Sequence, residues 1–332
     1  MSTAINIEIP LMIDEIEPAP FYTYIVLSDI RGNQYDQVLK KRGNWKKFGE
    51  LLENLIRHKD ELGVDYVPRT AHITLPGVVA HSKTIKNFFK DAEKQGQSIF
   101  ILKPTLGWNK KGVTTIKNRK EMLPWMLKYL YFPVWALQQF IKSYDFSQTK
   151  IMAPLGTLRV ETLWVVTHAP VQTVDVYNIT HWVCGVNYKG LSITSCAVDG
   201  EISRNRSFSG NSMELTEVFD KKDSNHIIKQ SDRIVRDVAW ATLRHIKCKA
   251  GTVSCFNIIS FDLMIDNEKK VWLLEANINS TVDYNKLRGD KEMEKVTNEI
   301  VKIAIDPIFP PHKPQEARDY NIIPDKMATI KR

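Results

Sequence analysis

The sequence predicts an α/β (α+β) protein in which mixed or antiparallel sheets are flanked by helices. Short segments rich in aromatic and β-branched residues alternate with longer segments of helical periodicity. The chain of 332 residues is long enough for about two or three domains with cores of their own. No apolar run approaches the roughly 20 residues that a membrane-spanning helix needs, so we expect no membrane association.

Residues 1–80 are expected to form a small N-terminal α/β domain. After a proline-bearing lead-in, Phe21 to Leu27 reads as a strand. Tyr35 to Arg57 reads mostly as a helix, with a break near Gly43. Pro68 to Pro76 is expected to be a loop or a short strand.

Residues 81–145 are expected to form a central unit. Ser82 is a suitable N-cap for a helix that runs to about Gln95. The segments that follow predict a strand, a glycine-containing turn, a second strand, a helical stretch and a third strand. The three strands are expected at Ile99 to Lys103, from Val113, and at Val134 to Ile141, and the helical stretch at residues 119–130.

Residues 146–312 are expected to form the largest unit, and residues 313–332 a loosely ordered tail. Two strand regions come first, then an amphipathic helix, two more strands and a last helix. These elements are expected at 157–167, 174–198, Asp232 to Lys247, Phe256 to Ile265, Val271 to Asn277 and Glu292 to Ile305.

The net charge of +8 favours acidic partners such as nucleic acid, anionic lipid or an acidic peptide. The densest basic stretch, Lys40 to Lys47, is too rich in apolar residues for a disordered nucleic-acid tail, so nucleic-acid binding would depend on charge alone. The four cysteines form no C-x-x-C pair, which predicts free thiols in a reducing cytosol. The N-terminus lacks the layout of a secretory signal, and we expect a cytoplasmic location.

The segment from Ile259 to Asn277 carries the most informative chemistry. Two apolar strands flank the polar turn Asp266 to Lys270, which predicts a β-hairpin. With a two-residue loop at Glu268 and Lys269, Ile265 would face Trp272 and Asp262 would face Glu275. Strand alternation places Glu275 and Asn277 on one face.

Two opposed carboxylates repel one another, and a hard cation removes that conflict. Asp262, Glu275 and the amide oxygen of Asn277 form an oxygen ligand set of the kind that Mg²⁺ uses together with substrate phosphates. The alternative is a loop of different length, in which the two acids would point apart.

A second constellation runs from Phe100 to Val113. A strand delivers Lys103, and a turn with Gly107 and Gly112 follows. Glycines let backbone N–H groups approach a phosphate, and the lysine charge suits the α- and β-phosphates of a nucleotide. A Walker A loop is excluded because Val113 stands where its lysine is needed. The alternative is an ordinary hairpin with a surface lysine.

These pieces, in this order, resemble the tubulin tyrosine ligase and ligase-like family, which has the ATP-grasp fold. The resemblance is most specific in residues 260–277, which match a family segment with F-D, D and W-L-(I/L)-E-V-N. Phe100 to Val113 is similar to the family's K-P-x-x-G-x-x-G-x-G-I segment, and Ala136 to Ile141 to its V-(I/V)-Q-K-Y-I strand. Gln37 to Phe48 resembles an N-terminal piece of the tyrosine ligase.

The resemblance implies a role for each matching residue. Lys103, and Lys83 as a second lysine, would bind the nucleotide phosphates. Arg159 would steady the γ-phosphate or acyl phosphate, and Thr194 would lie near the acceptor. The remaining candidates border the adenine or hold the metal; they are Gln138, Gln139, Phe140 and Ile141 for adenine, and Asp262, Glu275 and Asn277 for Mg²⁺, with Glu275 also catalytic.

Four positions depart from the family pattern. Thr157 stands where the family has an acid two residues before the arginine. Lys110 replaces the middle glycine of the phosphate loop, Ser195 replaces an asparagine, and Gln139 replaces a lysine. Nucleotide and metal binding are therefore expected to be retained more securely than the acceptor chemistry.

We therefore expect an ATP- and Mg²⁺-dependent carboxylate–amine ligase that attaches a free amino acid to an acidic protein tail through an acyl phosphate. The resemblance implies tubulin as the acceptor and an association with the cytoskeleton, and we expect a monomer. The alternatives are a ligase with another peptide or metabolite acceptor, and a degenerate ligase that acts as a binding module.

Overall fold

The protein is described by a computed structural model. It describes residues 43–44, 64–79, 82–105, 112–153, 155–167, 171–186, 212–242, 247–248, 254–278 and 326–331. The strand predicted at Phe21 to Leu27 and the helix at Glu292 to Ile305 lie outside these residues.

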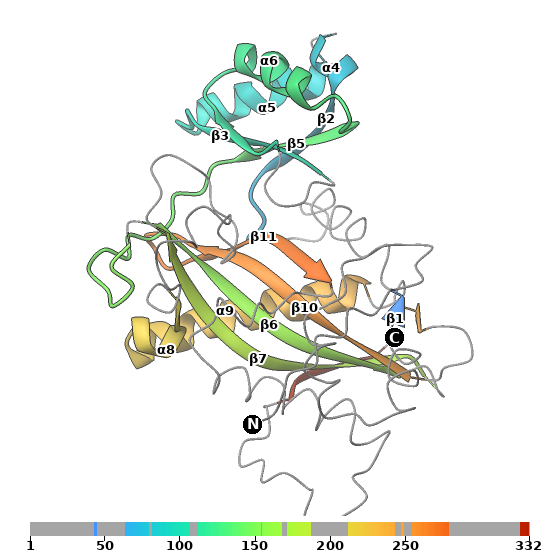
Figure 1. The fold of residues 1–332 in the computed structure, drawn as a ribbon, viewed down its shortest axis with the longest axis vertical. Coiled ribbons are helices and arrows are strands. Elements are labelled where there is room, and N and C mark those ends of the chain that lie inside the picture. The colour runs from blue at the N-terminus through green and yellow to red at the C-terminus, as the bar shows by residue number, and fades with distance from the viewer. Residues whose placement is uncertain are drawn as a thin grey trace, which may run out of the picture.

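A four-stranded antiparallel sheet with helices on one face forms the smaller unit (Figure 1). Its strand order is β2-β5-β3-β4. The strands are β2 (Thr70–Thr74), β3 (Phe100–Pro104), β4 (Thr114–Ile116) and β5 (Val134–Gln139). The helices are α4 (Leu75–Val79), α5 (Lys83–Lys94), η1 (Arg119–Glu121), α6 (Met122–Met126) and η2 (Leu127–Tyr129).

Helix α5 begins after Ser82 as predicted, although the Ser82 side chain makes no capping hydrogen bond. Its buried residues Ile85, Phe88 and Ala92 join a core with Phe100 and Leu102 of β3. Because side chains alternate along a strand, Ile101 and Lys103 project from the opposite face of this sheet. The small sheet therefore has one face covered by helices and a second face that carries Lys103.

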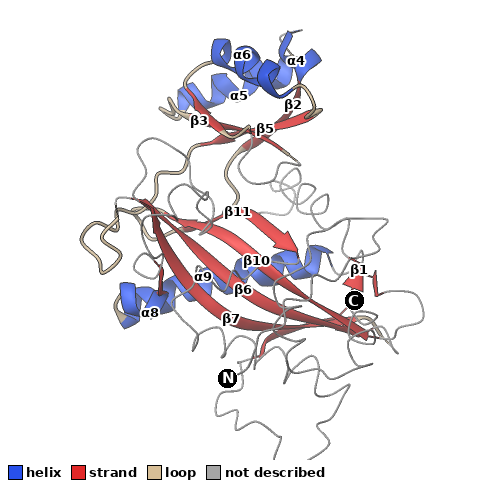
Figure 2. Ribbon diagram, in the orientation of Figure 1, coloured by secondary structure: helices blue, strands red, loops and turns tan. Residues whose placement is uncertain are grey.

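The larger unit is a six-stranded antiparallel sheet among the described residues (Figure 2). Its main path is β11-β10-β6-β7-β12, and β8 pairs with β7. These strands are β6 (Leu155–Thr167), β7 (Thr173–Val186), β8 (Ser212–Glu214), β10 (Ser254–Ile265), β11 (Val271–Ile278) and β12 (Lys326–Lys331). Two helices accompany it, α8 (Leu215–Val218) and α9 (Lys221–Thr242).

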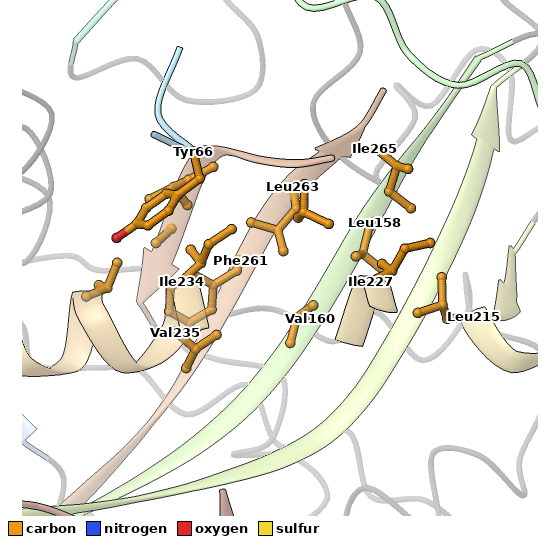
Figure 3. Packing of buried hydrophobic residues seen from close by; sticks show 14 of the residues in the cluster. Tyr66, Leu158, Val160, Leu215, Ile227, Ile234, Val235, Phe261, Leu263 and Ile265 are labelled. Carbon is orange, nitrogen blue, oxygen red and sulfur yellow. The ribbon is translucent and has the colours of Figure 1, made fainter. Parts of the chain in front are cut away.

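Helix α9 covers one face of the large sheet (Figure 3). Its residues Ile227, Ile234 and Val235 pack in one core with Leu158 of β6 and Phe261 of β10. Tyr66 joins this core from the segment before β2, and its hydroxyl donates a hydrogen bond to Asp237 of α9 at 3.0 Å. Burial, and then the charge of Asp237, raise the pKa of Tyr66 far above its usual value.

Helix α9 starts eleven residues before the predicted Asp232. Ser224 and Ser231 lie on its buried face and interrupt the apolar periodicity. Both hydroxyls donate to main-chain carbonyls, Ser224 to Leu215 and Phe219 and Ser231 to Ile228. A buried hydroxyl that is hydrogen-bonded in this way is compatible with a core. In the sequence, however, these serines read as polar residues and hide the first turns of the helix.

Long-range pairing changes two predicted boundaries and places one further segment. β2 lies before the predicted boundary at residue 80 but pairs with β5 after it, so that boundary divides one sheet. Residues 326–331 form β12 and pair with β7, so the loosely ordered tail was wrong for this stretch. β1 (Gly43–Asn44) pairs with β9 (Lys247–Cys248) in a separate two-stranded sheet, and β1 also contacts β10, so the predicted break near Gly43 lies beside the larger unit.

Cys184 on β7 is disulfide-bonded, so the prediction of a free thiol was wrong for this residue. Cysteine spacing in a sequence does not reveal which thiols meet in the fold. In the described part of the chain, no helix is long and apolar enough to cross a membrane.

Candidate nucleotide and metal site

The β10–β11 hairpin turns through three residues, Asn267 to Lys269, and the predicted two-residue loop was wrong. The Asp266 N–H donates to the Lys270 carbonyl at 3.0 Å, and the Lys269 N–H to the Asp266 carbonyl at 2.9 Å. Lys269 has a φ of 62°, the left-handed conformation that closes this type of loop. The Asp266 carboxylate stabilises the turn by accepting the N–H groups of Glu268 and Lys270.

A β-bulge in the hairpin brings Asp262 opposite Glu275. Near the turn Ile265 pairs with Val271 instead of the predicted Trp272, and Leu263 pairs with Leu273. The register then shifts, and Asp262 pairs with Glu275 as predicted. Leu274 is the extra residue. If the ladder continued without this bulge, Leu274 would pair with Asp262, and Glu275 would lie opposite Phe261, on the face that packs against α9.

The two faces of the hairpin have different chemistry because of this bulge. The α9 face carries Phe261, Leu263, Leu273 and Ala276, all members of the main core. The step from Leu273 to Ala276 spans three residues, so both intervening side chains are directed to the second face. Leu274, Glu275 and Asp262 therefore share the face opposite α9, which we call the carboxylate face.

Arg159 lies between the acids of the carboxylate face. It pairs with Asp262 in the β6–β10 register, and its Nη1 donates to Asp262 Oδ1 at 3.2 Å. Its Nε donates to Glu161 Oε1 at 2.7 Å. The arginine is 13% exposed, and the carboxylates of Glu161 and Asp262 are almost fully buried. The structure thus brings together two predicted site residues, Arg159 and Asp262.

Glu161 and Ser260 belong to this cluster, and the sequence reasoning missed them. Ser260 pairs with Glu161 in the strand register, and its hydroxyl donates to Glu161 Oε1 at 3.0 Å. A signal was present in the sequence: Arg159 and Glu161 stand two residues apart in a strand that is otherwise uncharged. That spacing puts both charged groups on one face, where a buried ion pair is the favourable arrangement.

The electrostatics of the cluster keep Arg159 charged. Burial alone would lower the pKa of its guanidinium, but the carboxylates of Glu161, Asp262 and Glu275 outweigh burial and raise the pKa above its usual value. A permanently charged guanidinium beside carboxylates is suited to stabilise a phosphoryl group in transfer.

The donor set fits a cation that also contacts phosphate. Asp262 and Glu275 are opposed on the carboxylate face, and Mg²⁺ typically uses one or two carboxylates together with phosphates. Among the described residues, no group of three His, Cys, Asp or Glu side chains is placed to hold a metal ion. Asn277 pairs with Ser260 in the backbone of β11, and its side chain lies outside the described part of the structure.

Lys103 connects the small sheet to the hairpin. It projects from the face of β3 opposite the helices, and its Nζ donates to the carbonyl of Leu274 at 3.3 Å. Leu274 is the bulge residue next to Glu275, so the lysine charge lies beside the carboxylate face. Two segments far apart in the sequence therefore meet here, and nucleotide binding by Lys103 stays a prediction.

The predicted adenine segment leads from β5 to the hairpin. Gln138 is buried and donates its side-chain amide to Thr70 at 2.9 Å, and Gln139 Oε1 accepts the Arg69 N–H at 3.3 Å. Phe140 is half-buried. Ile141 forms a small apolar cluster with Met264 and Leu274, and Trp272 packs against this cluster.

Other predicted residues are not brought to this cluster. Lys83 is exposed in the first turn of α5, on the helical side of the small sheet, away from the face with Lys103. Thr194, Ser195, Gly107 and Lys110 lie outside the described residues. Gly112 has a φ of 81°, a conformation that favours glycine, and an added Cβ would lie 2.9 Å from the Pro104 side chain. Thr157 is buried on the strand of Arg159 and contributes no charge.

The two units meet at the carboxylate hairpin, where Lys103 of the small sheet contacts Leu274 of β11. A family model described as YheC/D like ATP-grasp matches residues 193–305, the stretch that contains α9 and the β10–β11 hairpin. The match confirms the predicted fold class, and ATP-grasp enzymes in general are ATP-dependent ligases that typically use Mg²⁺. It supports a carboxylate–amine ligase, while the resemblance to tubulin tyrosine ligase stays a prediction.

Proposed function

We propose that this protein is an ATP-dependent ligase that joins the amine of a free amino acid to a carboxylate of an acidic protein tail. The observation that carries the proposal is the bulged hairpin, which opposes Asp262 and Glu275 next to Arg159. Opposed acids beside a buried guanidinium form an arrangement suited to metal-assisted phosphoryl transfer.

The reaction has two steps. An oxygen of the acceptor carboxylate forms a bond to the γ-phosphorus of ATP, the bond from that phosphorus to the β–γ bridging oxygen breaks, and ADP leaves. The amine then attacks the carbonyl of the acyl phosphate, a C–N bond forms, inorganic phosphate leaves and the amine loses a proton to solvent.

The residues of the carboxylate face have separate roles in this scheme. Arg159 stabilises the charge of the phosphoryl group in transfer. Asp262 and Glu275, with Asn277 as a further candidate, would hold Mg²⁺, which supplies charge neutralisation on the phosphates when bound. Lys103 binds the α- and β-phosphates, and the segment from Gln138 to Ile141 borders the adenine.

Acidic tubulin tails are the acceptor that we favour. The net charge of +8 draws an acidic segment toward the protein, and the resemblance of the hairpin and phosphate segments points to the same class of acceptor. An acidic peptide other than tubulin, or a small metabolite, would use the same chemistry. Thr157 motivates a third possibility, a degenerate ligase that only binds its partner.

Mass spectrometry of tubulin tails tests the proposal. The protein is incubated with tubulin, Mg-ATP and the full set of proteinogenic amino acids. We expect a mass increase equal to one or more amino acid residues on a tail peptide, and no increase when ATP is omitted. ATP-dependent ligation to another acidic peptide but not to tubulin would select a different acceptor, and failure to bind Mg-ATP would favour the binding module.

Replacing Lys103 by methionine is expected to weaken Mg-ATP binding about tenfold, because a charged donor to the phosphates is lost. Isothermal titration calorimetry measures the dissociation constant. The reference variant is Lys83→Met, which removes an exposed lysine from the far side of the same sheet. An equal loss in both variants would assign Lys83 to the phosphates as well, and no loss in Lys103→Met would remove Lys103 from the site.

A further inference from the structure

Glu161 is a buried carboxylate that the scheme above does not use. It lies on β6 two residues after Arg159, and 1% of the residue is exposed. Burial of a carboxylate is unfavourable unless the charge is paired and hydrogen-bonded. One carboxylate, that of Asp262, already neutralises the guanidinium, so the second acid calls for a separate explanation.

The geometry around Arg159 supplies that explanation. Glu161 Oε1 accepts the Arg159 Nε–H at 2.7 Å, and the same oxygen accepts the Ser260 hydroxyl at 3.0 Å. Asp262 Oδ1 accepts a hydrogen bond from Nη1 at the other end of the guanidinium. Two carboxylates therefore fix the plane of the guanidinium. Asp262 is also a proposed metal ligand, and Glu161 is not.

The two carboxylates differ in what else they serve. In the proposed function Asp262 also binds a cation. The positive charge of that cation weakens the attraction between Asp262 and the Arg159 guanidinium. Glu161 lies in the next strand, away from Glu275, and is itself anchored by Ser260. It stays available to Arg159 whether or not the cation is bound.

We propose that Glu161 is a positioning residue that orients the Arg159 guanidinium toward the γ-phosphate. The proposal rests on the proposed function, because it assigns Glu161 a part in the same phosphate site. A preorganised charged donor binds its target without first losing side-chain freedom. Glu161, anchored by Ser260, thus sets how strongly the site prefers a nucleoside triphosphate to a diphosphate.

The test compares a non-hydrolysable ATP analogue with ADP, each with Mg²⁺, by isothermal titration calorimetry on the full chain. In Glu161→Gln we expect the affinity for the analogue to fall about tenfold, the lower end of what losing a partner that orients a ligand typically costs. The ADP affinity should stay within about twofold, because Glu161 acts only through the γ-phosphate contact of Arg159. Glu93→Gln, the same change at an exposed site on α5, should alter neither affinity.

Repeating Glu161→Gln in a protein that also carries Arg159→Lys shows whether Glu161 acts through the arginine or by a general effect on the fold. Arg159→Lys keeps the positive charge but removes the Nε–H that Glu161 accepts. In that background, adding Glu161→Gln should change the analogue affinity by less than about threefold, because the interaction it disrupts is already absent. Ser260→Ala should reproduce part of the Glu161→Gln effect, since it removes the donor that anchors Glu161.

Three results would overturn the proposal in distinguishable ways. If the unmodified protein binds neither nucleotide, the proposed function fails together with this inference. If it prefers the analogue and Glu161→Gln keeps that preference, only the positioning role fails. Equal losses for the analogue and for ADP, or equal losses in both arginine backgrounds, would show that Glu161 only supports the fold.

Discussion

Replacing Glu275 by glutamine is expected to abolish ATP turnover and leave the fold intact. The amide has the shape of the carboxylate but no charge to share with a cation. We expect a loss of roughly 100-fold or more in the rate of ADP release, the scale seen when a group that stabilises transition-state charge is removed. The measurement is ADP release from Mg-ATP in the presence of tubulin and amino acids.

Thermal melting distinguishes this loss of function from unfolding. Without metal, the stability of Glu275→Gln should stay within about 1 kcal/mol of that of the unmodified protein, because the substitution removes both the repulsion from Asp262 and the attraction to Arg159. Mg-ATP should raise the melting temperature of the unmodified protein but much less that of the variant. Glu268→Gln, in the exposed turn of the same hairpin, is the matched control and should behave like the unmodified protein. Unchanged ligation by Glu275→Gln would refute the metal assignment.

Of the substitutions proposed here, Arg159→Met is expected to lower the free energy of unfolding the most. The side chain of Arg159 is mostly buried and compensates the buried carboxylates of Glu161 and Asp262. Removing one partner of a buried ion pair typically costs about 3–5 kcal/mol, because the remaining charge is left uncompensated. Urea denaturation followed by circular dichroism measures the free energy of unfolding.

Two further variants test the cause of this loss. Arg233→Met removes an arginine that is half exposed and pairs with Asp65 and Asp237 at the surface, so it should cost less than about 1 kcal/mol. Arg159→Met combined with Glu161→Gln should recover part of the stability, because one uncompensated acid disappears as well. Equal losses in Arg159→Met and Arg233→Met would contradict the description of Arg159 as a buried charge partner.

The pairing of the β10–β11 hairpin could be predicted only in part from the sequence. The opposition of Asp262 and Glu275 is confirmed, yet the loop length used to predict it was wrong. A three-residue loop shifts the pairing by one position, and the bulge at Leu274 shifts it back. Neither feature has a clear signature here: the left-handed loop position holds Lys269 where glycine is common, and the extra leucine looks like any strand residue.

Elements with strong local patterns were predicted well. The strands of the hairpin, β3, β5 and the helical stretch at 119–130 lie where the sequence placed them. Features that depend on distant partners were not: β12 is recognised as a strand through its pairing with β7. The short strand expected within Pro68 to Pro76 is present as β2, but only its pairing with β5 assigns it to the small sheet. Strand pairing between segments far apart in the chain leaves no local periodicity to read.

The sequence by itself determined the fold class, the hairpin with its two acids, and the lysine strand, because alternating apolar residues and turn residues are local properties. The tertiary structure decided which face those acids occupy, that Lys103 reaches Leu274, and that Glu161 and Ser260 join Arg159. The physical reason is that a one-residue bulge moves a side chain across the sheet, and that strand pairing brings Asp262 and Ser260 of β10 beside Arg159 and Glu161 of β6.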